Sequence, residues 1–343
     1  MANDETFLAT ILADLCADMG AELSLEAAHG RAGFVTFKNG RRCFFKNACF
    51  DINGMGAAQI TKDKDYCAKF LDEAGINTPA SRIVFAPKAI EAFSLKNPSL
   101  GRQLAANSDA MKVATEFGFP LFVKPNEGAE GKGVQLVHAM DELQTHLNCL
   151  YQAHDRVLLQ KPIAGNDYRI IVLDGEVAAA YLRRPLGVLG NGMDTIEQLL
   201  FKRRGEIAHM GRPSSIAPGD PRILQHLRGQ GLDIHDVVED GLSVRLLANA
   251  NLSSGGDVID VTNTIDAGYE RVATDAAGAV GLRFAGIDVL CQAIDRFDDA
   301  YAVLEVNAAP GLNNYSATGE RERQTVINIY RKLLLVMEFG DPA

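Results

Sequence analysis

The chain has 343 residues, of which 47% are hydrophobic and 23% charged, so it is long enough for two or three domains with buried cores. Its formal net charge of -10 argues against nucleic acid or an anionic membrane as the main partner. No apolar run is long enough to cross a bilayer, and the first fifteen residues lack the basic start of a secretory signal.

The first eighty residues predict a helix, a hairpin and a second helix. Apolar residues recur at helical spacing over 5–19. Two alternating runs, 33–37 and 42–45, flank Asn39-Gly40, a dipeptide that is typical of tight hairpin turns. Residues 63–74 then favour a helix that ends at the glycine which follows.

From residue 107 onwards, strands and helices follow each other without strict alternation. Helices are expected over 109–117, 140–150, 195–203, 269–280 and 324–337, and strands over 120–124, 134–137, 157–160, 168–173, 177–182, 285–290 and 302–306. A stretch rich in Gly, Pro and Ser, 204–220, predicts a mobile loop, and 221–245 a small helical insertion. This pattern favours an α+β protein over a doubly wound sheet.

A glycine-rich loop over 126–133 is the first candidate site. The strand before it delivers Lys124, and glycines allow backbone N–H groups to approach an anion closely. A lysine next to such amides suits nucleotide phosphates. The loop is neither a Walker motif nor a Rossmann fingerprint, because it leads into a strand. A plain glycine-rich hairpin is the alternative.

Oxygen-bearing side chains in two late strands form the second candidate site. Asp288 interrupts one apolar strand, while Glu305 and Asn307 share one face of the next by the period of two. Mg²⁺ prefers a few carboxylates together with phosphate oxygens. A lone carboxylate usually marks the polar side of a strand, but two such strands downstream of a phosphate loop favour a metal site.

Basic residues between these two segments form the third candidate. Arg169 and the pair Arg183-Arg184 lie near strand ends. Surface arginines are usually only solvated, but in this position they suit a clamp on a transferring phosphoryl group.

The cysteines and histidines favour no metal centre of their own. The six cysteines form no C-x-x-C pair, and no histidine lies at metal-finger spacing from them. Free thiols in a reducing compartment, the cytoplasm, are expected. The seven histidines include no H-E-x-x-H, which disfavours a zinc hydrolase.

Together these segments resemble the ATP-grasp superfamily, in particular the ATP-grasp domain of cyanophycin synthetase and the C-terminal half of bifunctional glutathione synthetase. The resemblance runs from about residue 51 to the end of the chain. Its motifs are 63–65, 74–79, 124–133, 163–169, 183–185, 190–196, 250–256, 259–262, Asp288 and 305–311.

The resemblance implies an α+β fold in which ATP is clamped between two parts. An N-terminal α/β domain over 1–106 would precede a central lid over 107–163. A C-terminal α+β domain over 164–343, with an insertion near 204–245, would complete the clamp.

The resemblance also implies roles for individual residues. Nucleotide contacts would come from Lys124, Gly128, Gly131, Lys132, Gly133, Gln160, Lys161, Ile163 and Asp167. Metal ligands would be Asp288, Glu305 and Asn307, and the acyl phosphate would be surrounded by the catalytic residues Arg169, Arg184 and Asn251. Substrate contacts would come from Ser253, Ser254, Gly255, Asn313 and Ser316. Gln160 departs from the family pattern, which often has an acid at this position.

The expected activity is an ATP-dependent ligation of a carboxylate to an amine, with ADP and phosphate released. Cofactors would be ATP and Mg²⁺, with Mn²⁺ as an alternative metal. Substrates would be amino acids or small peptides joined once, with no nucleic acid or membrane partner, and the resemblance suggests a homodimer. The rival predictions are a kinase that phosphorylates a hydroxyl or carboxylate without forming an amide, a non-catalytic nucleotide-binding partner, and a structural protein.

Overall fold

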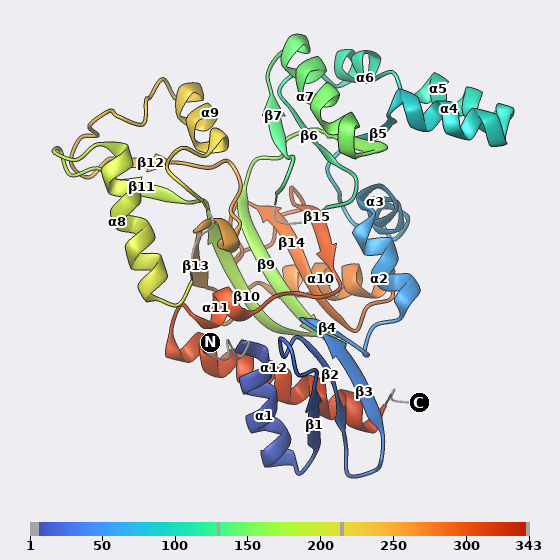
Figure 1. Cartoon of the computed structure of the whole chain (residues 1–343), viewed down its shortest axis with the longest axis vertical. Helices are drawn as coiled ribbons and strands as arrows, with labels where there is room; N and C mark the ends of the chain where they lie inside the picture. The colour runs from blue at the N-terminus through green and yellow to red at the C-terminus, as the bar shows by residue number, and fades with distance from the viewer. Residues whose placement is uncertain (1–6, 129–130, 213–215, 341–343) are drawn as a thin grey trace.

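The structure is a computed structural model, and it describes residues 7–128, 131–212 and 216–340 (Figure 1). Within these ranges the chain forms four sheets, with mainly antiparallel neighbours. The mixed α+β class expected from the sequence is confirmed. No helix in the described part of the chain is long and apolar enough to span a membrane.

The N-terminal sheet is an antiparallel meander in the order β1-β2-β3-β4. Its elements are α1 (Phe7–Met19), β1 (Glu22–Leu25), β2 (Ala32–Thr36), β3 (Arg42–Lys46) and β4 (Cys49–Phe50). The expected hairpin about Asn39-Gly40 is confirmed by the pairing of β2 with β3. The strands of this stretch pair antiparallel, with no helix between them.

The last helix of the chain, α12 (Glu320–Phe339), packs beside this meander (Figure 1). Its apolar face joins α1, β2, β3 and the central sheet in one core that includes Leu12, Phe45, Tyr330 and Leu334. The two ends of the polypeptide therefore stabilise each other, which no local sequence pattern predicts.

The lid sheet has the order β5-β8-β6-β7. Its strands are β5 (Ser81–Phe85), β6 (Leu121–Pro125), β7 (Gln135–Val137) and β8 (Arg156–Gln160). Helices α6 (Ala110–Phe117) and α7 (Met140–Ala153) bury Val113, Leu143 and Leu147 against it. Two further helices, α4 (Pro87–Lys96) and α5 (Pro98–Asn107), project from the outer side of this sheet in Figure 1.

The central sheet has the order β13-β10-β9-β14-β15 and is covered on both faces. Its strands are β9 (Asn166–Leu173), β10 (Glu176–Arg184), β13 (Asp257–Asp260), β14 (Phe284–Cys291) and β15 (Ala302–Asn307). Helices α10 (Ala267–Ala279) and α3 (Lys64–Glu73) cover one face, whereas the N-terminal meander and α12 cover the other. Because both faces are buried, β14 and the second half of β9, residues 170–173, are nearly continuous apolar runs.

An insertion over 186–247 forms a separate unit with its own core, to the left in Figure 1. It contains β11 (Gly187–Leu189), α8 (Ile196–His209), α9 (Pro221–Gly229) and β12 (Ser243–Arg245). Thr195 and Gln198 form a capping box at the start of α8. The expected mobile loop over 204–220 is wrong at its start, because α8 continues to His209, and residues 213–215 lie outside the described ranges. The insertion thus begins earlier than the sequence suggested.

Three short elements connect these parts. They are α2 (Met55–Lys62), the 3₁₀ turn η1 (Leu252–Ser254) and α11 (Asn313–Ser316). The boundaries 1–106, 107–163 and 164–343 stay predictions, but β5 pairs with β8 and thus lies in the lid sheet.

Candidate functional site

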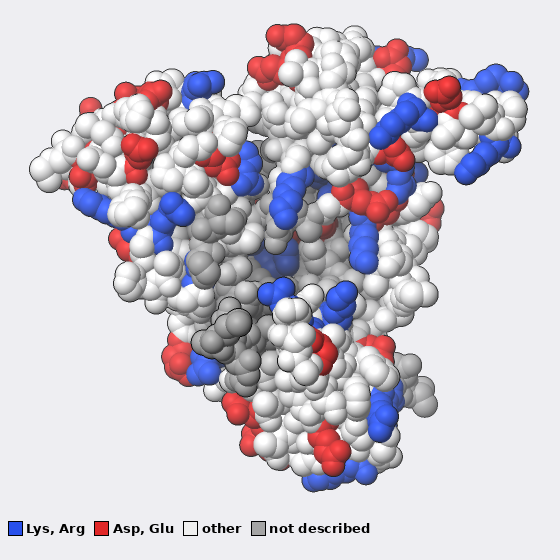
Figure 2. Space-filling model, in the orientation of Figure 1, with Lys and Arg blue, Asp and Glu red and all other residues white. Residues whose placement is uncertain are grey.

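A cavity of about 1180 Å³ lies between the lid sheet, the central sheet and the insertion. Figure 2 shows Lys and Arg side chains gathered around this hollow. The predicted residues in its wall are Lys124, Gly128, Gly131, Lys132, Gln160, Lys161, Ile163, Asp167, Arg169, Arg184, Asn251, Asp288, Glu305 and Asn307. The fold thus brings the three candidate segments of the sequence to one place.

The base of the glycine-rich loop is anchored to the start of α3. Asn126 accepts the backbone N–H of Lys64 on its carbonyl (3.2 Å) and that of Asp65 on its side chain (3.0 Å). Asp63, the N-cap of α3, pairs with Arg156 at 2.6 Å, and Arg156 also pairs with Glu127. These contacts fix where the loop begins, so its glycines extend over the cavity from a rigid base.

Lys124 points from β6 into the cavity and donates to Gln160 Oε1 at 2.8 Å. Burial, and then the nearby charge of Lys64, lower the pKa of Lys124 to about 8, while the charge of Glu305 opposes this shift. A bound anion would restore the full charge of this lysine, which suits a phosphate ligand.

The hinge after β8 offers backbone groups at the cavity edge. The N–H of Lys161 donates to Ala80 O at 2.9 Å, so it is not free for a ligand. Within the described residues, the Lys161 carbonyl and the Ile163 N–H form no hydrogen bond with the protein backbone. One acceptor and one donor therefore remain, which is the pattern that the edge of an adenine ring requires.

Two arginines and two aspartates form a buried charge network in the floor of the cavity. Asp288 accepts from Arg169 (Nη2 to Oδ2, 2.9 Å) and pairs with Arg183 at 2.8 Å, while Arg183 also pairs with Asp167 at 2.6 Å. Burial alone would raise the pKa of Asp288, but the two arginines hold it below its ordinary value. For Asp167, burial outweighs Arg183 and raises the pKa. Two arginines and two aspartates thus pair with one another in the floor of the cavity.

Glu305 and Asn307 differ from Asp288 in having unclaimed oxygens. Glu305 lies opposite Asp288 in the β14–β15 pairing, half-buried, and forms no ion pair within the described residues. Asn307 donates its Nδ2 to Gly286 O at 3.4 Å, which leaves its Oδ1 available. These donors fit a divalent cation that also takes phosphate oxygens. No three His, Cys, Asp or Glu side chains in the described ranges form a metal cluster by themselves.

The tip of the loop touches the segment after β12. A Cβ on Gly131, whose φ is +69°, would lie 2.4 Å from Asn249 Nδ2 and 2.9 Å from Asn251 Nδ2. Asn249 Oδ1 is buried and has no hydrogen-bond partner among the described residues, although it lines the cavity. A buried acceptor without a hydrogen bond costs free energy, so this atom suits a hydrogen-bond donor of a ligand.

The predicted substrate residues lie outside the cavity wall. Ser254 is buried, and its N–H and that of Gly255 donate to Asn251 O and Leu252 O within the η1 turn, so they are not free to hold an oxyanion. Two further predicted residues lie on α11, where Asn313 is exposed and Ser316 buried. The remaining predicted residues absent from the wall are Gly133, which backs onto α7, and Ser253.

Several residues in the wall were not predicted as site residues. They include Lys64 and Asn249, together with Arg222, His226, Arg228 and Arg245 of the insertion. Lys64 had a local signal, because it lies in a motif of the resemblance. The insertion residues had none, because only the tertiary fold turns them toward the cavity.

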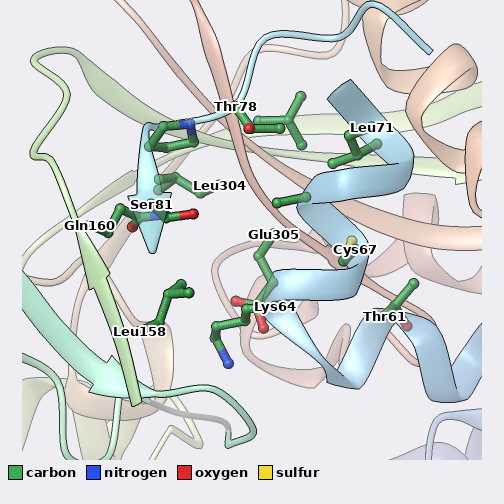
Figure 3. Close-up of a pocket in the computed structure, with 13 residues that line it drawn as sticks. Thr61, Lys64, Cys67, Leu71, Thr78, Ser81, Leu158, Gln160, Leu304 and Glu305 are labelled. Atoms are coloured by element: carbon green, nitrogen blue, oxygen red, sulfur yellow. The ribbon is translucent and has the colours of Figure 1, made fainter. Parts of the chain in front are cut away.

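A second, much smaller cavity of about 10 Å³ adjoins the site on the α3 side (Figure 3). Lys64, Gln160 and Glu305 line it together with Cys67, whose pKa burial raises to about 12. Its volume is near that of one water centre, so it carries no organic ligand. It does show that α3 and β15 meet directly behind the carboxylate of Glu305.

Comparison with known proteins finds two matching families and several relatives of this chain. Residues 98–185 match the family described as D-ala D-ala ligase C-terminus, and residues 245–336 match the RimK-like ATP-grasp domain. The glutathione biosynthesis bifunctional protein GshAB of Enterococcus faecalis is 27% identical over 281 residues, covering 78% of this chain and 34% of the relative. Cyanophycin synthetase of Geminocystis herdmanii is 29% identical over 277 residues, covering 78% of this chain and 29% of the relative.

A solved structure agrees with the fold over nearly the whole chain. The bifunctional glutathione synthetase from Pasteurella multocida superposes with a TM-score of 0.59 at 20% identity, covering 96% of this chain and 45% of that one. The chain spans about a third of the length of the curated relatives it matches. Fold and matched segments together identify it as a member of the ATP-grasp superfamily.

Proposed function

We propose that the protein is an ATP-dependent ligase that joins a carboxylate to an amine through an acyl phosphate. The observation that carries this proposal is the meeting, in one cavity, of Lys124 and its glycine loop with the Glu305 and Asn307 oxygens of β15. Such an arrangement suits a triphosphate whose terminal phosphoryl group is transferred, because cations there stabilise the negative charge of the transition state. The two matched families and the ligase and synthetase names of the relatives support the same reaction class.

The first step would transfer the γ-phosphoryl group from ATP to an oxygen of the substrate carboxylate and release ADP. Lys124 and the loop would neutralise the phosphates, and Arg169 and Arg184 would neutralise the carboxylate and the transferred group. A magnesium ion held by Glu305 and Asn307, with Asp288 beside them, would add positive charge at the phosphates. Phosphorylation turns a poor electrophile into one with a good leaving group.

The second step would be attack of the amine on the carbonyl carbon. The amine forms the C–N bond, loses a proton and expels phosphate. Asn251 lines the cavity, and its amide would hold the developing oxyanion, while Asn249 Oδ1 would accept a hydrogen bond from the incoming amine. Contact of the loop at Gly131 with both asparagines would exclude water from the acyl phosphate.

Amino acids or small peptides are the proposed substrates, and a kinase without an amine acceptor is the competing proposal. All six cysteines are free thiols, which supports a reducing compartment such as the cytoplasm. The test is a matrix of amino acids and dipeptides incubated with ATP and Mg²⁺, read by ADP release and product mass. ADP release that requires both a carboxylate and an amine supports a ligase. ADP release with one substrate alone and a phosphorylated product supports the kinase.

A further inference from the structure

The cavity carries more positive charge than a nucleotide and its metal require. Ten Lys and Arg residues and four Asp and Glu residues line it, although the whole chain has a net charge of -10. The phosphate side, around Lys124, Arg169 and Arg184, accounts for only part of this excess. The remainder lies on the insertion, across the cavity from the carboxylates of the central sheet.

Helix α9 presents one face to its own core and another to the cavity. Ile223 and Leu227, one turn apart, are buried in the core of the insertion. Arg222 and His226, also one turn apart, line the cavity instead. The apolar core of the insertion therefore fixes the polar face of α9 toward the site.

The end of α9 is fastened to β12, which brings a second pair of cations into the wall. Gln230 Nε2 donates to Arg245 O at 2.9 Å and to His226 O at 3.2 Å. Arg228 and Arg245 both line the cavity, and neither forms an ion pair within the described residues. Arg222, in contrast, is paired with Asp220 at 2.8 Å. Arg228 and Arg245 thus line the cavity, and neither is paired with a carboxylate of the described residues.

The insertion wall, defined as Arg228, Arg245 and His226, is continuous in the chain with the reacting end of the cavity. Arg245 and Asn251 are six residues apart, so at most about 20 Å separates their backbones. Arg245, Asn251 and Arg184 also line one and the same cavity. A ligand that fills this cavity contacts the insertion wall while its reactive group lies near Asn251 and Arg184.

We propose that the insertion wall binds a carboxylate of the substrate other than the one that reacts, so that one of the two substrates is acidic. Guanidinium groups bind carboxylates through two parallel hydrogen bonds, which adds geometric selection to charge. The proposal rests on the proposed function, which supplies the reacting carboxyl at the other end of the cavity. Burial and the charge of Arg245 lower the pKa of His226, so a bound anion would favour its protonated form.

The test uses the full chain saturated with a nonhydrolysable ATP analogue and Mg²⁺. Isothermal titration compares glutamate, aspartate and Glu-Glu with glutamine, asparagine and Gln-Gln, which have the same shape without the charge. We expect the acidic member of at least one pair to bind about 10-fold more tightly or better, as one charge-assisted contact provides. In the double variant Arg228→Gln/Arg245→Gln this preference should disappear while affinity for the analogue stays within about 2-fold.

The matched control is Lys202→Gln, which removes an exposed charge of the insertion that pairs with Asp194 away from the cavity. It should leave the preference unchanged. Equal binding of acid and amide by the wild type would overturn the proposal, as would a double variant that keeps the preference or loses nucleotide affinity to the same extent. Because the readout is binding, it stands apart from the ADP-release matrix. If the acidic ligand binds but no amide forms, the ligase proposal is refuted, whereas the proposal that the insertion wall binds an acidic ligand stands.

Discussion

Asp288 and Glu305 lie opposite each other across the antiparallel pair β14–β15, but only Asp288 is held by arginines. Its side chain is 6% exposed and bound by Arg169 and Arg183, whereas Glu305 has no ion pair within the described residues. The two carboxylates therefore have different tasks. Asp288 holds the floor of the site together, and Glu305 is available to a ligand.

This difference predicts that Asp288→Ala lowers stability, whereas Glu305→Ala abolishes activity and leaves stability nearly unchanged. Asp288→Ala leaves two buried guanidinium groups without their shared partner, so it should lower the free energy of unfolding by about 3 kcal/mol. Glu305→Ala removes no ion pair and should leave thermal stability nearly unchanged while abolishing ADP production. Thermal unfolding and ADP release of both variants, with Glu305→Gln as an isosteric control, measure this. Normal ADP production by Glu305→Ala would count against its role as a metal ligand.

Lys124 predicts that nucleotide binding takes up protons near pH 8. Its folded pKa of about 8 lies below the ordinary value, so at pH 8 about half of the molecules lack this charge. Bound phosphate favours the ammonium form, so proton uptake should be largest between pH 8 and 9 and vanish below pH 7. Titration calorimetry of an ATP analogue in buffers of different ionisation enthalpy counts these protons.

Lys124→Arg is the matched variant for this measurement, because arginine keeps its charge throughout. It should bind the analogue without uptake at pH 8.5. Uptake of the same size in that variant would assign the proton to another group.

The lowered pKa of Lys124 also makes the free energy of unfolding depend on pH. Because the folded pKa is lower than the unfolded value, the unfolded chain binds more protons between pH 8 and 10.5. The contribution of Lys124 to stability should therefore rise with pH through this window, when no nucleotide is present. Denaturant unfolding of the wild type and of Lys124→Met at pH 7 and pH 9.5 isolates this contribution, which should shrink to nothing in the variant.

Gly131 should tolerate no side chain when the loop is closed. Its left-handed φ of +69° costs an L-residue about 1 kcal/mol, and a Cβ would meet Asn249 and Asn251. Gly131→Ala should lower kcat/KM by about 10-fold with little change in melting temperature. Gly54→Ala, at a position with φ -62° and open space, is the control and should behave as wild type. Equal kinetics for both variants would remove the loop contact from the mechanism.

Asn251 is expected to act in turnover rather than in nucleotide binding. Loss of an oxyanion donor typically lowers kcat by about 100-fold, so Asn251→Ala should show this loss with an unchanged affinity for the ATP analogue. Unaltered turnover of the variant would remove Asn251 from this role.

Local sequence patterns predicted the elements that carry their own signals. The hairpin at Asn39-Gly40 follows from turn chemistry, and the helix from Lys64 follows from its Asp63 cap. The convergence of Lys124 with Asp288 and Glu305 was expected from the family resemblance, since nothing local links residues so far apart. The substrate contacts expected at Ser254 and Ser316 are buried away from the cavity.

The parts that sequence reasoning missed depend on long-range packing. The pairing of Arg183 with Asp288 requires β9, β10 and β14 to be aligned in one sheet. From the sequence alone, Arg228 and Arg245 look like ordinary solvated charges. In the structure they line the cavity, because the core around Ile223 and Leu227 orients α9 toward it. The α4–α5 helix pair was also missed; it buries few of its residues, and Phe93 and Leu95 stay exposed.

The most direct measurement is a crystal structure with a nonhydrolysable ATP analogue and Mg²⁺. The account predicts the triphosphate between Lys124 and the glycine loop on one side and a cation on Glu305 and Asn307 on the other, with adenine at the hinge by Lys161. An analogue bound outside this cavity, or a cation held without Glu305, would contradict it.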